Sequence, residues 1–363
     1  NNPIRRVLAR NLFVSSKLSL NVLSKLFQKS SLVLGLLLLS SSWNLQALTS
    51  KSGRVNNHRS DAIILSSTVL IDYVRPNLMK ADSQLPASPV DIWNPHKGFL
   101  VQSIDPESYN LNFPTTGAHN LYFDLLITGI DVNELTWLPV THEGITATVT
   151  NVVANDRWIP DEDKGKVFPR VKLTGPVAGN QWDNPNPSRI TVPKLPQKFE
   201  LVGKDSDGNE VVRYGFELRQ WFVNRGDRRD TASNQTTWCS SLGYRMPQIK
   251  DLTNAVCVDH NPYSSDPSYS KCKNAVTIDA KLSSGNRFYQ RRIGAGFFTE
   301  WGMIDTFFIP DAGFVGSAYL TSFPCSEEKN GFLAVHMGGG DLGMCGKDDD
   351  VATLRDHVIC STP

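Results

Sequence analysis

Three groups of residues in this sequence have types and spacings that could bind or react. All six cysteines lie in the last 125 residues, at Cys239, Cys257, Cys272, Cys325, Cys345 and Cys360. The tripeptide Arg225-Gly226-Asp227 places a cation and a carboxylate on either side of a glycine. A segment from Gly313 to Asp350 combines aromatic residues with three consecutive glycines.

The cysteines predict disulfide bonds. An even number confined to one part of an exported chain is typical of disulfide-bonded domains, so we expect three bonds. The sequence has no CxxC or CxH pair, so we expect no zinc site. Six cysteines allow 15 pairings, and the sequence does not choose among them. Local spacing favours Cys257–Cys272 and Cys325–Cys345.

Arg225 and Asp227 are candidate ligand-binding residues, because this tripeptide is the integrin-binding sequence. A turn centred on glycine can present the two charges on opposite sides, and the carboxylate can ligate a receptor metal. A structural role is the alternative, in which Asp227 pairs with Arg228 or Arg229 where two domains meet.

The segment after Gly313 supplies Tyr319, Phe332 and His336 as further candidates. Glycine-rich loops that display aromatic rings suit a protein-binding surface. In the alternative interpretation the aromatic residues fill a small core. We expect Tyr319 and His336 to be more exposed than Phe314, and Trp301 to be buried.

Catalysis and cofactor binding are not expected. With the cysteines oxidised no thiol nucleophile remains, the sequence has no Gly-x-Ser-x-Gly, and its seven histidines are scattered. The run Asp348–Asp350 could attract a cation, but adjacent acids in a polar loop are usually solvated. We therefore expect no metal, no cofactor and no enzyme activity.

The first 47 residues resemble a secretory signal. Residues 1–60 carry nine Lys and Arg and no acid, and the apolar block Leu32–Leu39 precedes Leu45-Gln46-Ala47. Eight to twelve apolar residues are too few to span about 30 Å of hydrocarbon. Without residues 1–47 the chain has 31 basic and 36 acidic residues, so it has no general attraction for nucleic acid. We expect a secreted or cell-surface protein.

Residues 48–92 are Ser- and Pro-containing and predict a linker, in which the apolar run from Ala62 to Val74 could be a strand or a short helix. Residues 93–218 predict an immunoglobulin-like β-sandwich, because short strands alternate with turn residues. The expected strands are Phe99–Ile104, Tyr109–Phe113, Leu121–Ile130, Ile145–Val153, Val167–Leu173, Ile190–Val192, Lys198–Gly203 and Glu210–Leu218. The run Lys204–Asn209 predicts the hairpin between the last two.

Residues 219–363 predict an α+β domain. Asp230 or Thr231 can cap a helix that ends at Leu242 before Gly243. A second helix is expected from about Gln248, with Ile249, Leu252 and Val256 on one face. The expected fold class is therefore mainly β, with an α+β C-terminal domain.

These C-terminal residues resemble a known fold. Trp238–Pro247, the following helix, Gly296–Gly302 and a last strand holding Cys360 resemble the C-type lectin-like fold. They are similar to the terminal domain of intimin/invasin-type enterobacterial adhesins, in which immunoglobulin-like domains come first. The resemblance implies that Cys239 pairs with Cys360, which is also the pair that local spacing leaves over.

The resemblance implies an exported adhesin whose lectin-like head binds a host-cell protein or glycan. The calcium- and sugar-binding motifs Glu-Pro-Asn, Gln-Pro-Asp and Trp-Asn-Asp are absent from the sequence, so sugar specificity is not implied. Contact with a membrane is expected only through the signal peptide or an unseen anchor. The alternatives are a secreted, non-adhesive interaction module and an enzyme of the formylglycine-generating type, which would need reactive thiols.

Overall fold

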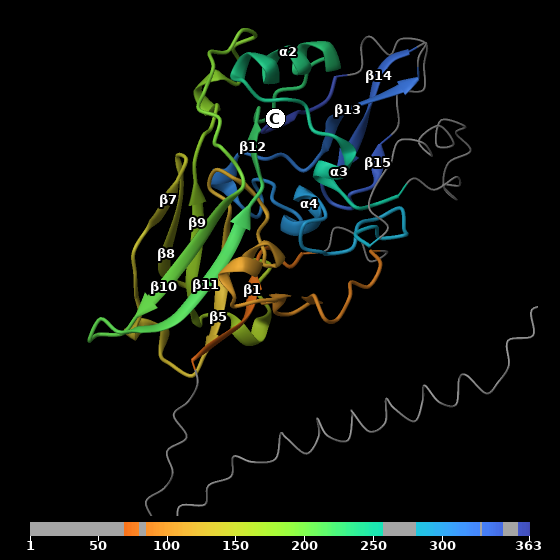
Figure 1. The fold of residues 1–363 in the computed structure, drawn as a ribbon. Coiled ribbons are helices and arrows are strands. Elements are labelled where there is room, and N and C mark those ends of the chain that lie inside the picture. The colour runs from red at the N-terminus through yellow and green to blue at the C-terminus, as the bar shows by residue number, and fades with distance from the viewer. Residues whose placement is uncertain (1–68, 80–84, 257–280, 327–328, 344–354) are drawn as a thin grey trace, which may run out of the picture. The chain divides into compact units, whose positions relative to one another are not determined.

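The computed structural model describes residues 69–79, 85–256, 281–326, 329–343 and 355–363 (Figure 1). The expected signal peptide, Cys257, Cys272, Cys345 and the acidic run Asp348–Asp350 lie outside these ranges. Cys325 lies in a described strand, but its side chain is outside the description.

The larger of two sandwich sheets has seven strands, and every neighbouring pair in it is antiparallel. In spatial order the strands are β2 (Trp93–Asn94), β3 (Gly98–Leu100), β1 (Leu70–Arg75), β5 (Tyr122–Thr128), β9 (Val167–Thr174), β8 (Ile145–Val153) and β7 (Val140–His142). Residues along β9 alternate between buried and half-buried, as expected for a strand with one face on a core.

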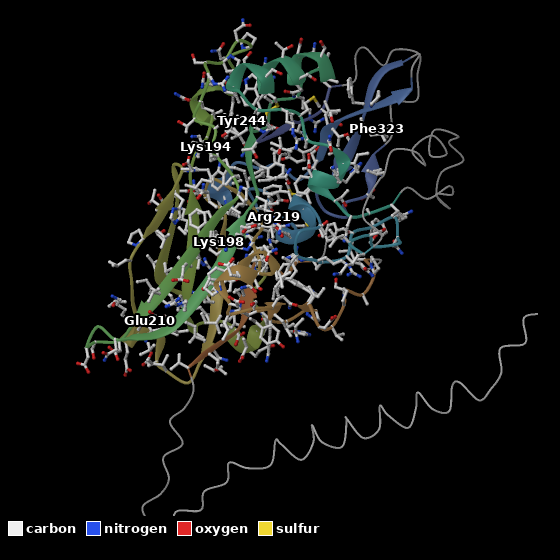
Figure 2. All side chains as sticks on the ribbon, in the orientation of Figure 1. Lys194, Lys198, Glu210, Arg219, Tyr244 and Phe323 are labelled. Carbon is white, nitrogen blue, oxygen red and sulfur yellow. A yellow bond between two sulfur atoms is a disulfide. The ribbon has the colours of Figure 1, made fainter. Side chains whose placement is uncertain are left out.

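The second sheet has the order β11 (Glu210–Leu218), β10 (Gln197–Lys204) and β6 (Thr136–Trp137). β10 and β11 form the expected hairpin, at whose turn Asp205 Oδ1 accepts hydrogen bonds from the backbone N–H groups of Asp207 and Asn209. Figure 2 labels Glu210, the first residue of β11, beside this turn.

The two sheets pack against each other through aromatic side chains. The ring of Phe123 in β5 lies 6.1 Å from the rings of both Tyr214 and Phe216 in β11. Phe199 in β10 lies 5.1 Å from the ring of His142 in β7. All three phenylalanines are fully buried, so these contacts form the interior of a β-sandwich.

Strand β1 differs from the linker expected at 48–92. It pairs with β3 on one side and with β5 on the other, inside the seven-stranded sheet. The side chains of Val74 and Arg75 are fully buried there. The apolar residues before Pro76 therefore supply a strand of the sandwich, and the Ser and Pro residues lie to either side of it.

Two of the expected strands, Tyr109–Phe113 and Ile190–Val192, are wrong. Tyr109 lies in a 3₁₀ helix, Pro106–Leu111, because Pro106 cannot donate to a ladder and Asp105 caps the turn by accepting from the Glu107 N–H. Residues 190–192 are extended but lie in no sheet. Further 3₁₀ turns occur at Val132–Glu134, Asp161–Asp163, Gly179–Gln181 and Pro310–Ala312.

The C-terminal part contains a three-stranded sheet that includes a strand from the sandwich region. Its order is β16 (Ile359–Ser361), β12 (Gln220–Asn224) and β4 (Thr116–Ala118), and β12 is parallel to β4. A third small sheet consists of β13 (Ala318–Ser326), β14 (Lys329–His336) and β15 (Leu342–Gly343). The α-helices in the described ranges are α2 (Ala232–Leu242), α3 (Ile249–Leu252) and α4 (Phe297–Trp301).

Helix α2 confirms the expected helix and both of its ends. The Thr231 hydroxyl accepts from the Asn234 N–H, and Gly243 ends the helix with φ = +90°. Helix α3 is shorter than expected. The chain is extended from Thr253, where the Asn254 side chain donates to the carbonyls of Leu282 and Gln290, and Val256 lies outside the helix.

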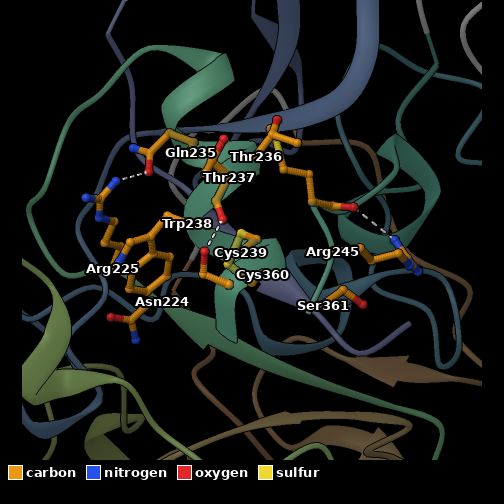
Figure 3. Close-up of a disulfide and its surroundings, with 12 residues drawn as sticks. Asn224, Arg225, Gln235, Thr236, Thr237, Trp238, Cys239, Arg245, Cys360 and Ser361 are labelled. Atoms are coloured by element: carbon orange, nitrogen blue, oxygen red, sulfur yellow. Dashed lines mark hydrogen bonds between the residues drawn. A yellow bond between two sulfur atoms is a disulfide. The ribbon is translucent and has the colours of Figure 1, made fainter. Parts of the chain in front are cut away.

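A disulfide joins Cys239 in α2 to Cys360 in β16, with 5.5 Å between the Cα atoms (Figure 3). This confirms the pairing implied by the resemblance. Both cysteines are fully buried, beside Trp238. The fold class is likewise confirmed: the chain is mainly β, and a β-sandwich is followed by an α+β part in which a disulfide joins helix α2 to strand β16. No helix among the described residues is long and apolar enough to cross a membrane.

Candidate functional site

Arg225 is buried, which removes one end of the integrin-type tripeptide from the surface. Its side chain is only 1% exposed, and its guanidinium donates from Nε to the Trp182 carbonyl and from NH1 to Gln235 Oε1 (Figure 3). It also lies 4.9 Å from the ring of Trp238. Burial lowers the pKa of Arg225, and the carboxylate of Asp230, 3.6 Å away, opposes that effect. In this conformation Arg225 cannot contact a partner.

Asp227 is exposed, but it already has a partner inside the protein. Its Oδ1 lies 3.0 Å from Nε2 of His357, whose side chain is fully buried. Asp227 thus pairs with a residue of its own chain, as in the structural alternative. Its partner is His357, however, and neither Arg228 nor Arg229. The two charged ends of the tripeptide are therefore not presented together at the surface.

Tyr319 is fully buried, so the expectation that it is exposed is wrong. Its hydroxyl donates to the Val315 carbonyl and accepts from the Val315 N–H, and burial raises its pKa. Trp301 is fully buried, as expected, and Phe314 is fully buried as well. Phe332 is half-buried, whereas His336 is exposed at the end of β14. Of the three candidates in this segment, only His336 is fully available.

His336 lines a polar cavity of about 360 Å³ at the turn between β14 and β15. The turn is closed by two backbone bonds, from the His336 N–H to the Asp341 carbonyl and from the Gly340 N–H to the His336 carbonyl. The cavity is also lined by Arg287, Phe288, Asp305, Ser317 and Asp341. Three separate segments, which contain residues 287–288, Asp305 and Ser317, therefore meet the β14–β15 turn at this cavity.

The glycines at the turn are required by close contacts. Gly340 has φ = +68°, and a Cβ there would lie 2.4 Å from Thr253 Oγ1 and 2.5 Å from Tyr289 Cδ1. A Cβ at Gly339 would lie 2.6 Å from Asp341 Oδ1. Gly339 and Gly340 therefore let the turn pack closely on its neighbours, which fixes the position of His336 and Asp341.

The cavity offers both signs of charge together with hydroxyl and backbone groups. Asp305 and Asp341 are hydrogen-bond acceptors, Arg287 is a cation, and Ser317 can donate or accept. Such a set suits a hydroxyl-rich or mixed-charge ligand. The described residues contain no group of three or more His, Cys, Asp or Glu side chains that could hold a metal ion.

Catalysis needs more than this set of residues. A serine nucleophile must be hydrogen-bonded to its base. Ser317 and His336 both line the cavity, but no hydrogen bond joins their side chains in the part of the chain that the structure describes.

Sequence reasoning found His336 but missed the two carboxylates. Asp341 directly follows Gly338–Gly340, and its position after a tight turn was a usable signal. Asp305 is 31 residues before His336, and no local pattern connects them. Its place in the cavity depends on the bridge that pairs Asp305 with Phe314.

The buried carboxylate of Glu300 holds this part of the chain to the sandwich. It accepts hydrogen bonds from the backbone and hydroxyl groups of Thr115 and Thr116, at 2.6–3.2 Å, and from the Gly294 N–H at 2.7 Å. Burial raises the pKa of Glu300, and these hydrogen bonds oppose the rise. The segment that leads to the cavity is thus fixed to β4.

The fold and the cavity together define a mainly β protein with a polar cavity in its α+β part. No family model matches the sequence, and no curated protein matches it. Among solved structures it is similar to invasin, described as a bacterial integrin-binding protein, at 13% identity and a TM-score of 0.43. That match covers 81% of this chain and 39% of the invasin chain.

Two intimin structures are also similar. An intimin mutant from EHEC O157:H7 has 10% identity and a TM-score of 0.33, and the match covers 74% of this chain and 92% of that chain. Intimin in a complex with Tir90 has 11% identity and a TM-score of 0.33, with coverage of 80% and 98%. Matches this distant transfer no site residue, so the function is argued from the geometry of this chain.

Proposed function

We propose that this chain is an exported, adhesin-like protein whose C-terminal part, 219–363, is a lectin-like head. The head binds a protein or glycan on another cell through the polar cavity beside Gly338–Gly340. The observation that carries the proposal is the cavity itself. It is polar, about 360 Å³ in volume, and lined by His336, Asp341 and Asp305.

The rigidity of the cavity wall supports a binding role. The turn packs on Thr253 and Tyr289 without room for a Cβ at Gly340, and Glu300 holds the adjoining segment to β4. A site built on fixed elements loses little conformational entropy when it binds. The sandwich would then act as a support that carries the head.

Binding of the purified chain to cultured animal cells tests this proposal. We expect saturable binding by flow cytometry, weakened at least fivefold by His336→Ala and by Asp341→Asn. The matched controls are His96→Ala and Asp207→Asn, which change exposed residues of the sandwich region and should bind as the parent does. Cells that bind no protein above background, or equal loss with the controls, would contradict the proposal.

Treatment of the cells before binding separates the two receptor classes. Loss of binding after protease treatment alone indicates a protein receptor. Loss after glycosidase treatment, with the protein component intact, indicates a glycan. The alternative of a secreted interaction module predicts no retention on any cell surface.

A further inference from the structure

A second cavity lies between the segment before β2 and the segment that leads to α4. Its volume is about 220 Å³, and its walls are mostly apolar. Leu78, Met79, Val90 and Trp93 line it from one side, and Tyr289 and Arg291 from the other. The proposed cell-binding site does not use this cavity, because its polar cavity has other lining residues.

Two buried polar side chains in this wall have unused hydrogen-bonding groups. The Tyr289 hydroxyl and the Arg291 guanidinium lie close enough to each other to interact, which opposes the rise in the pKa of Tyr289 that burial causes. Neither the Tyr289 hydroxyl nor the Nε and NH1 groups of Arg291, however, makes a hydrogen bond of normal geometry to the described residues. Tyr289 is 1% exposed and Arg291 is 7% exposed. Buried donors without a good acceptor are energetically unfavourable, so these groups would favour an acceptor that enters the cavity.

Arg291 is held in place by its remaining contacts. Its NH2 donates to the Asn77 carbonyl at 2.9 Å, its backbone N–H donates to Ser88 Oγ, and its guanidinium lies 4.3 Å from the ring of Trp93. The side chain is therefore fixed across the wall before any ligand arrives. Burial lowers the pKa of Arg291 to about 10, which leaves it cationic at neutral pH.

The neighbouring carboxylate does not use these donors. Glu300 is close enough to Arg291 to raise the pKa of that guanidinium. Its oxygens, however, accept from Thr115, Thr116 and Gly294. An acceptor that enters the cavity would thus meet a cation and a hydroxyl whose donors are still available.

We propose that this cavity binds a small apolar carboxylate. The carboxylate accepts hydrogen bonds from Arg291 and Tyr289, and the apolar body packs against Trp93 and Leu78. An apolar cavity of about 150 Å³ holds benzene, so the volume here accommodates a ring or a branched chain together with a carboxylate. Exposed Met79 and Val90 extend the apolar surface around the cavity. Such a group occurs in free aromatic or branched acids and at the C-terminus of a peptide.

Isothermal titration of the full chain tests the proposal with phenylacetate, indole-3-acetate and isovalerate. We expect saturable binding of at least one acid, and at least tenfold weaker binding of the corresponding neutral amide. The peptide Gly-Gly-Phe with a free C-terminus, compared with its C-terminal amide, tests whether the carboxylate comes from the end of a peptide chain. Tighter binding of the peptide than of phenylacetate assigns the site to a chain end, and the reverse assigns it to a free acid.

Tyr289→Phe removes only the hydroxyl and should weaken binding of the acid about five- to tenfold. Tyr244→Phe is the matched control, because that hydroxyl donates to the Thr191 carbonyl elsewhere in the molecule (Figure 2). Arg291→Met should abolish binding. If circular dichroism shows that Arg291→Met does not fold, the comparison of Tyr289→Phe with Tyr244→Phe decides whether the proposal holds. No binding of any acid, equal binding of acid and amide, or an unchanged affinity in Tyr289→Phe would overturn the proposal.

Discussion

At the scale of single residues, Glu300 and Gly340 do the most to position the cavity. Glu300 is a buried carboxylate that accepts from Thr115, Thr116 and Gly294, none of which carries a charge. Gly340 allows the β14–β15 turn to approach Tyr289 and Thr253. Each residue joins segments that are far apart in the sequence.

Replacing Glu300 with Gln should destabilise the protein by about 1–3 kcal/mol at pH 7, because the amide nitrogen places a donor among donors. The difference should widen between pH 7 and pH 5. Burial raises the pKa of Glu300, so its protonated form favours the folded state, and that contribution is lost as pH rises through the folded pKa. Urea unfolding of both proteins at several pH values measures this, and a gap that narrows on acidification would contradict it.

Gly340→Ala should destabilise the protein more than Gly208→Ala. Gly340 has φ = +68° and Gly208 has φ = +83°. An L residue is strained at such a φ, so each variant should be destabilised by about 1 kcal/mol for this reason alone. Nothing lies within 4 Å of a Cβ at Gly208, whereas a Cβ at Gly340 would clash with Tyr289 and Thr253. We expect an additional cost of about 1–3 kcal/mol for Gly340→Ala in urea unfolding. Equal costs would show that the turn is not tightly packed.

The residue-level expectations failed where burial depends on distant segments. Arg225 and Tyr319 have side chains that often lie at a surface, but the Trp182 carbonyl accepts a hydrogen bond from Arg225, and Phe298 and His357 lie against the ring of Tyr319. No pattern in the sequence near either residue predicts these partners. His336 is predictable because it lies two residues before the glycine run Gly338–Gly340, which is a local signal.

At the scale of elements, the features set by local chemistry were predictable. Helix α2 has Thr231 and Gly243 as its caps, and the β10–β11 hairpin has Asp205 and Gly208 in its turn. Strand β1 was not recognised as part of the sandwich, because its partners β3 and β5 lie 23 or more residues later. The short length of α3 follows from tertiary bonds of Asn254, which no local pattern reveals.

The disulfide between α2 and β16 should contribute substantially to stability. It joins residues 121 positions apart, and removal of such a bond typically costs about 2–5 kcal/mol. The double variant Cys239→Ser and Cys360→Ser isolates this bond, whereas a reductant would also act on the other cysteines. A loss of less than about 1 kcal/mol in urea unfolding would mean that packing alone holds α2 to β16.

At the scale of the whole molecule, the sandwich and the α+β part share one core among the described residues. β4 from the sandwich region pairs with β12, and Trp221 of β12 packs against Gly117 and Gly175. The indole of Trp221 also donates to the Pro176 carbonyl at 2.9 Å. Buried apolar residues from both parts form one continuous cluster.

A shared core predicts that residues 65–363 unfold in one cooperative transition. Far-ultraviolet circular dichroism would follow the strands, and tryptophan fluorescence would follow the aromatic core that includes Trp221 and Trp301. The two signals should have the same midpoint in urea. Two separate midpoints would mean that the sandwich and the α+β part are stabilised independently.

If the polar cavity beside Gly338–Gly340 is the cell-binding site, a variant that fills the cavity should lose cell binding. Ser317→Trp places a large side chain in the cavity, and Ser206→Trp adds the same side chain at the exposed β10–β11 turn. We expect Ser317→Trp, once circular dichroism shows that it is folded, to bind cells at least tenfold more weakly, while Ser206→Trp binds as the parent does. Undiminished cell binding by Ser317→Trp would show that the polar cavity is not the cell-binding site.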